Sequence, residues 1–111
     1  MLEALWSVDF QSNSQMWGTG VAVFETGRVL GGDSAMVYIG EFSVDPNGTV
    51  HAEIKVSRYS TVPMPSVVGM ENFTLSVKGK ADRKEMKLTG VVKEDPSRTI
   101  TIHAVRRAEL P

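Results

Sequence analysis

The chain has 111 residues, of which 41% are hydrophobic and 23% are charged, which is typical of one folded domain and not of a disordered protein. Twelve Lys and Arg residues against thirteen Asp and Glu residues give a net charge of −1, without the basic excess that nucleic-acid phosphates attract. The sequence contains no cysteine, which excludes disulfides, zinc–thiolate sites and thiol catalysis.

The N-terminal sequence MLEALWSVDF has early acidic residues and no long apolar core, so it lacks the pattern of a secretory signal peptide. No apolar run approaches the roughly 20 residues of a membrane-spanning helix. We therefore expect a cytoplasmic protein that binds neither nucleic acid nor a membrane.

Short apolar runs bounded by glycine or by polar turns recur along the whole chain, and this pattern predicts successive antiparallel strands. Most of the runs alternate apolar and polar side chains with a period of two, as strands with one buried face do. The predicted strands span residues 4–12, 18–25, 28–30, 35–44, 49–57, 73–80, 85–93 and 99–106.

The segments between the predicted strands have the composition of tight turns. Gly27 is free to take a positive φ in a hairpin, and Asp-Pro-Asn-Gly at 45–48 is the clearest turn sequence in the chain. Gly40 interrupts its own strand and indicates a bulge or a bend. Residues 59–72, which contain two prolines, form the longest predicted irregular segment.

Consecutive hairpins without long crossovers favour an up-and-down barrel over a Greek key. Closure of the sheet also removes the exposed edges along which strands aggregate. We therefore predict an all-β fold in which residues 1–111 form a single small antiparallel barrel of about eight strands.

Every second side chain of these strands is apolar and is predicted to point into the barrel. A small apolar ligand in the barrel interior would contact the largest of them, although side chains alone can fill so small a barrel. The candidates that line the interior are Trp6, Phe10, Ile54, Phe73, Leu75, Leu88 and Ile102.

Two of the strands are apolar on both faces, over residues 21–24 and 35–39. We assign Val21, Val23, Val37 and Ile39 to the interior, which leaves a second apolar set that needs another cover. A homodimer contact is the favoured cover, with a partner protein or the irregular segment as alternatives. The interface candidates in this second set are Ala22, Phe24, Met36 and Tyr38.

Residues that carry chemistry are few. His51 and His103 occupy outward positions, where exposed strand residues are favoured over a metal site shared with Glu53. Asp33 follows two glycines, and we expect its carboxylate to cap a turn by accepting hydrogen bonds from backbone amides, in preference to an anion site formed by the loop. No nucleophile–base, phosphate-loop or metalloprotease motif is present, so we expect no catalytic residue, no cofactor and no metal.

The chain resembles the GrlR-like family of bacterial proteins in GTG at 18–20, GGDS at 31–34 and YIG at 38–40. The similarity continues through RY at 58–59 and PSV at 65–67, about the middle half of the chain. The resemblance implies a dimeric, lipocalin-like barrel of eight strands around an apolar interior.

The same resemblance implies a negative regulator of type III secretion, which acts by holding a transcriptional activator and not by catalysis. An acidic run on an exposed turn contacts the partner in that family. The matching turn here contains Asp45 and Asn47 as partner-loop candidates and keeps a single acidic residue. The first functional hypothesis is therefore a dimeric regulatory protein-interaction module, and the alternative is a carrier or sensor of a small lipid-like ligand.

Overall fold

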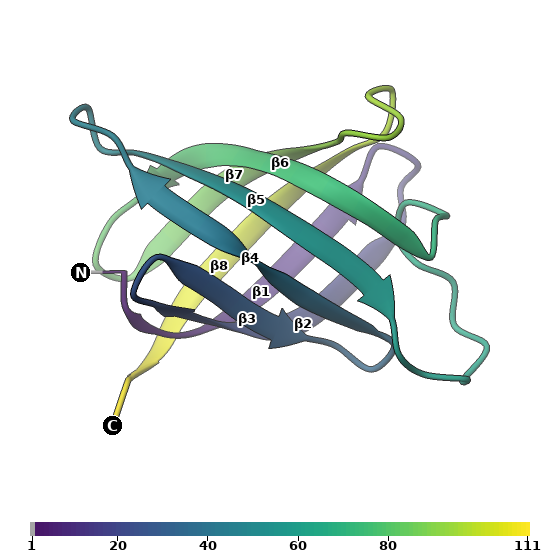
Figure 1. Cartoon of the computed structure of the whole chain (residues 1–111), viewed down its shortest axis with the longest axis horizontal. Coiled ribbons are helices and arrows are strands. Elements are labelled where there is room, and N and C mark those ends of the chain that lie inside the picture. Colours follow the sequence, from purple (N-terminus) through teal and green to yellow (C-terminus); the bar gives the residue numbers. More distant parts are fainter. Residues whose placement is uncertain (1) are drawn as a thin grey trace.

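The computed structural model describes residues 2–111 and shows a closed barrel of eight antiparallel strands in that range (Figure 1). Each strand pairs with the next one along the chain, and β8 closes the barrel on β1. No helix among the described residues has the length and apolar character that a membrane crossing requires. The strands are β1 (Ala4–Ser12), β2 (Trp17–Glu25), β3 (Arg28–Gly32), β4 (Met36–Val44), β5 (Thr49–Arg58), β6 (Asn72–Ala81), β7 (Glu85–Val92) and β8 (Thr99–Glu109). The predicted fold class is confirmed, and the predicted strands differ from these only at their ends.

Alternation along the strands creates the apolar interior. On β5, for example, Val50 and Val56 are buried while His51 and Glu53 are exposed. β6 and β7 repeat this pattern, with Val77 and Met86 among the most buried side chains. Because successive strand residues point to opposite faces, one wall of each strand lines the barrel and the other meets solvent.

Aromatic side chains close one end of the barrel. Trp6 is fully buried, and its indole Nε1 donates a hydrogen bond to the Leu2 carbonyl oxygen at 2.9 Å. The Phe24 ring lies 6.2 Å from the Trp6 ring and 4.9 Å from the Phe42 ring, measured between centroids. The Arg106 guanidinium lies 5.7 Å from the centroid of the Trp6 ring, a cation–π distance. The indole thus packs against the Phe24 ring, and the Arg106 guanidinium lies over it.

The position of Gly40 in β4 has no room for a side chain. A Cβ atom at this position would overlap the carbonyl oxygen of Glu53 and lie 2.8 Å from the Cα atom of Ile54, because β4 passes very close to β5 there. The pairing of β4 with β5 runs without a register shift through this point. The bulge that the sequence left open at Gly40 is therefore absent from this pairing.

The connection between β5 and β6, residues 59–71, lies at the other end of the barrel, on the right in Figure 1. The Tyr59 hydroxyl donates a hydrogen bond of 2.6 Å to the carbonyl oxygen of Asp33 in the β3–β4 turn. Arg98 donates a hydrogen bond from Nη1 to the carbonyl oxygen of Val68. These contacts tie the connection to the barrel although it contains no regular strand or helix.

The inward and outward faces of β2 and β4 are the reverse of the prediction. Ala22 pairs with Trp6 on β1, and Tyr38 pairs with Val56 on β5. Both partners point into the barrel, and residues paired in register share one face of a sheet. The predicted dimer or partner interface is therefore wrong as an outer surface, because its members all face the interior: Ala22, Phe24, Met36 and Tyr38.

The outer face of β2, β3 and β4 carries the other apolar set. Val23, Leu30 and Ile39 pair in one row across the three strands, and Val21 and Val37 flank Gly32 in the next row. Ile39 is 56% exposed, Val21 50% and Leu30 45%. Because both faces are apolar, period-two alternation alone did not reveal which of them is buried. We call these five residues, Val21, Val23, Leu30, Val37 and Ile39, the outer apolar face.

Candidate functional site

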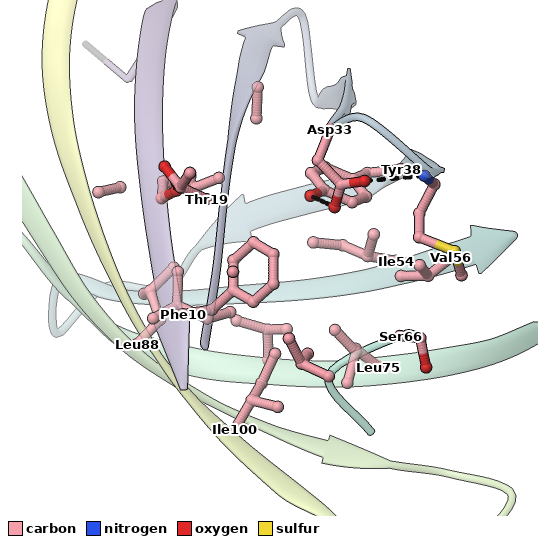
Figure 2. A pocket seen from close by; sticks show the side chains of 18 of the residues that line it. Phe10, Thr19, Asp33, Tyr38, Ile54, Val56, Ser66, Leu75, Leu88 and Ile100 are labelled. Atoms are coloured by element: carbon pink, nitrogen blue, oxygen red, sulfur yellow. Dashed lines mark hydrogen bonds between the residues drawn. The ribbon is translucent and has the colours of Figure 1, made fainter. Parts of the chain in front are cut away.

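A cavity of about 360 Å³ occupies the barrel interior between the aromatic end and the connection 59–71 (Figure 2). Its walls are mainly apolar side chains from the inward faces of the strands. Among the predicted interior residues, those that line it are Phe10, Ile54, Phe73, Leu75, Leu88 and Ile102. Trp6, the remaining member of the predicted set, is buried in the closed end and does not line the cavity.

Asp33 and Tyr38 form a polar pair at the open end of the cavity, as Figure 2 shows. Asp33 Oδ1 accepts hydrogen bonds of 2.8 Å from the backbone N–H groups of Ala35 and Met36, so the predicted turn cap is confirmed. Asp33 Oδ2 accepts a short hydrogen bond from the Tyr38 hydroxyl. Burial, followed by this hydrogen bond to a carboxylate, raises the pKa of Tyr38 above its usual range, so the phenol keeps its proton.

Two glycines of β2 leave room for this arrangement. A Cβ atom at Gly18 would overlap the Phe10 ring, and one at Gly20 would lie 2.9 Å from the Tyr38 hydroxyl oxygen and 3.1 Å from Asp33 Cβ. Phe10 and Tyr38 in turn meet edge to face, with ring centroids 6.3 Å apart. The Gly-x-Gly sequence of β2 therefore leaves space for the side chains at the open end of the cavity, which we call the mouth.

The sequence alone identified the Asp33 cap but missed its pairing with Tyr38. The pairing follows once Tyr38 is placed inside the barrel, because Asp33 lies in the β3–β4 turn just before the strand that carries this inward tyrosine. An inward Tyr38 follows from its register opposite Val56, which alternation had correctly placed inside.

Part of the connection 59–71 forms the rim of the mouth. Met64 and residues 65–67 line the cavity, and the Ser34 hydroxyl lies 3.4 Å from the Met64 sulfur. Arg58 Nη2 donates a hydrogen bond of 2.5 Å to the Met64 carbonyl oxygen. Arg58 Nε lies 3.2 Å from a carboxylate oxygen of Glu71, an ion-pair distance without hydrogen-bond geometry. Arg58 therefore points toward the rim and not into the cavity.

The histidines are not brought together with Glu53. His51 Nε2 lies 3.0 Å from Asp45 Oδ2, and His103 Nε2 lies 3.5 Å from Glu85 Oε2. Glu53 instead pairs with a neighbouring lysine at 3.0 Å. The described part of the chain contains no group of three or more His, Asp or Glu side chains placed to bind a metal ion.

The partner-loop candidates lie in the hairpin turn between β4 and β5. Asp45 Oδ1 accepts hydrogen bonds from the backbone N–H groups of Asn47 at 2.9 Å and Thr49 at 3.0 Å. The hydrogen bond with His51, together with these two, holds the pKa of Asp45 below its usual range. Asp45 thus organises the turn, while Asn47 is exposed at its tip.

No protein-family model matches the chain, and no curated protein matches it in sequence. Among solved structures, a redesigned β-barrel matches with a TM-score of 0.52 and 10% sequence identity, over 96% of this chain and 91% of the designed one. This likeness supports the barrel fold alone, because identity so low carries no information about a site.

Proposed function

We propose that the protein is a non-enzymatic binding protein that holds a small, mainly apolar ligand inside its barrel. The observation that carries this proposal is the apolar cavity of about 360 Å³, closed by aromatic rings at one end and bordered by polar groups at the other. Ligand pockets commonly measure about 300–1,000 Å³ and combine apolar walls with a few placed polar groups. Removing the apolar surface of a ligand from water would supply the driving force for binding.

The proposal is tested with N-phenyl-1-naphthylamine, an uncharged probe whose fluorescence rises in apolar surroundings. We expect the wild-type protein to bind it, and Ile54→Trp to weaken binding by about tenfold or more, because the added indole would occupy the cavity that Ile54 lines. The measurement is a fluorescence titration, with near-ultraviolet circular dichroism to verify the fold.

The matched control is Lys55→Trp, which introduces the same side chain one residue along β5, on the exposed outer face. Its probe affinity should equal that of the wild type. A wild-type protein that does not enhance the fluorescence of the probe, or an Ile54→Trp variant that binds it normally, would show that the interior is not the binding site.

A second proposed function is protein–protein interaction, carried by the outer apolar face. Large aliphatic side chains gathered on one exposed surface commonly mark a site of association. We propose that a second copy of the chain packs on this face, since homo-oligomers usually join like surfaces about a twofold axis. A regulatory partner, as the GrlR-like resemblance implies, is the competing occupant.

The self-association proposal predicts that Ile39→Lys raises the dissociation constant of the dimer by about tenfold or more, because a lysine would be buried against apolar side chains. Sedimentation velocity over a range of protein concentrations measures it. Val91→Lys provides the control, since Val91 is an exposed valine on β7, outside the outer apolar face. A wild-type chain that stays monomeric at the highest concentration contradicts the homodimer.

A further inference from the structure

The polar groups at the mouth of the cavity differ in kind from those that hold an anionic ligand. Among the described residues that line the cavity, Asp33 is the one acidic side chain, and no Lys, Arg or His lies among them. Two arginines contact the connection 59–71 from outside the cavity lining: Arg58 pairs with the Met64 carbonyl and Glu71, and Arg98 with the Val68 carbonyl and Asp95. The lining of the cavity therefore contains one acidic side chain and no cation, and each of the two nearby arginines already has a carboxylate partner.

The hydrogen bonds of the Asp33–Tyr38 pair leave acceptors, not donors, for a ligand at this point of the mouth. The backbone N–H groups of Ala35 and Met36 already donate to Asp33 Oδ1, and the Tyr38 hydroxyl donates its single proton to Oδ2. A phenol oxygen that has donated its proton retains lone pairs, and a carboxylate oxygen accepts more than one hydrogen bond. Asp33 Oδ2 and the Tyr38 oxygen are thus the groups that face the apolar cavity in Figure 2 with accepting capacity to spare.

The other polar side chains around the cavity add no positive charge to its lining. The Thr19 hydroxyl lies 3.0 Å from Asp9 Oδ1 and 3.2 Å from the Val8 carbonyl oxygen, and its single proton is shared between these two acceptors. The Ser66 hydroxyl oxygen accepts a hydrogen bond of 2.9 Å from the backbone N–H of Met70. Neither supplies the positive charge that a buried carboxylate or phosphate needs.

We propose that the ligand is an apolar chain or ring that ends in a hydrogen-bond donor, a hydroxyl or a protonated amine, and that the Asp33–Tyr38 pair excludes carboxylates and phosphates. This inference rests on the proposed ligand-binding function and adds the chemistry of the head group. The donor of the ligand would form hydrogen bonds with the free acceptors of the pair, while the apolar part of the ligand fills the space between Phe10, Ile54 and Leu75. A fatty-acid carboxylate would approach Asp33 charge to charge at a site partly removed from water.

The test is displacement of bound N-phenyl-1-naphthylamine at neutral pH by three ligands with the same chain: decan-1-ol, decylamine and decanoate. We expect decanol and decylamine to displace the probe at concentrations about tenfold or more below that of decanoate, since a hydrogen bond to a charged group and a like-charge contact differ by at least that factor. Equal displacement by decanoate would overturn the proposal.

Two variants distinguish the effect of the Asp33 charge on ligand selection from that of the Tyr38 hydroxyl. Asp33→Asn keeps an oxygen that accepts from Ala35 and Met36 but removes the charge, so decanoate should gain affinity and decylamine should lose its advantage over decanoate. Tyr38→Phe keeps the charge, so the discrimination against decanoate should remain. If both variants discriminate as the wild type does, the pair does not select the head group. Absence of probe binding to the wild type would instead contradict ligand binding itself, so the two failures are distinguishable.

Discussion

Trp6→Ala is expected to lower the free energy of unfolding by about 3–5 kcal/mol, as the loss of a large buried aromatic side chain does. The indole is fully buried at the closed end of the barrel, where it packs on Phe24 and beneath the Arg106 guanidinium. Truncation would leave a void among these groups and remove the donor that satisfies the Leu2 carbonyl oxygen. Urea denaturation followed by fluorescence and circular dichroism measures the change.

The second tryptophan of the chain provides the control. Trp17 begins β2 and is 70% exposed at the rim of the cavity, so Trp17→Ala should change the free energy of unfolding by no more than about 0.5 kcal/mol. If the two alanine variants were equally stable, the aromatic end would not contribute to folding as its packing indicates. The comparison also separates stability from binding, because Trp17 borders the mouth and Trp6 does not.

Gly40→Val should destabilise the barrel by more than about 4 kcal/mol, the range that point mutations reach only through severe steric or polar conflicts. The Cβ atom of the valine would overlap the carbonyl oxygen of Glu53, and backbone atoms move aside far less readily than a side chain does. To avoid this overlap β4 would have to move away from β5 and lose ladder hydrogen bonds. The fraction of folded protein and its thermal midpoint report the outcome.

Ser43→Val introduces the same side chain on the exposed face of the same strand and serves as the reference for Gly40→Val. Valine is favourable in strands, so this variant should fold and be about as stable as the wild type. A Gly40→Val protein with the same thermal midpoint as Ser43→Val would mean that β4 and β5 are not held as closely as the structure indicates.

Period-two alternation predicted the strands and the inward faces of most of them. Ile54 on β5, Leu75 on β6 and Leu88 on β7 all line the cavity as the pattern indicates, because each of these strands has one clearly polar face. The same rule was wrong for β2 and β4. Over residues 21–24 and 35–39 both faces are apolar, and the choice between them follows from the pairing with β1 and β5.

The amino-acid sequence by itself determined that the chain forms consecutive hairpins with an apolar interior, because turn residues and side-chain alternation act over a few neighbouring positions. Tertiary structure alone decided which apolar face of β2 and β4 turns inward, that Trp6 closes one end, and that Asp33 meets Tyr38 at the other. These features depend on the register between strands and on the closure of the barrel. Register and closure bring residues from separate strands into contact, and no local pattern in the sequence predicts such contacts.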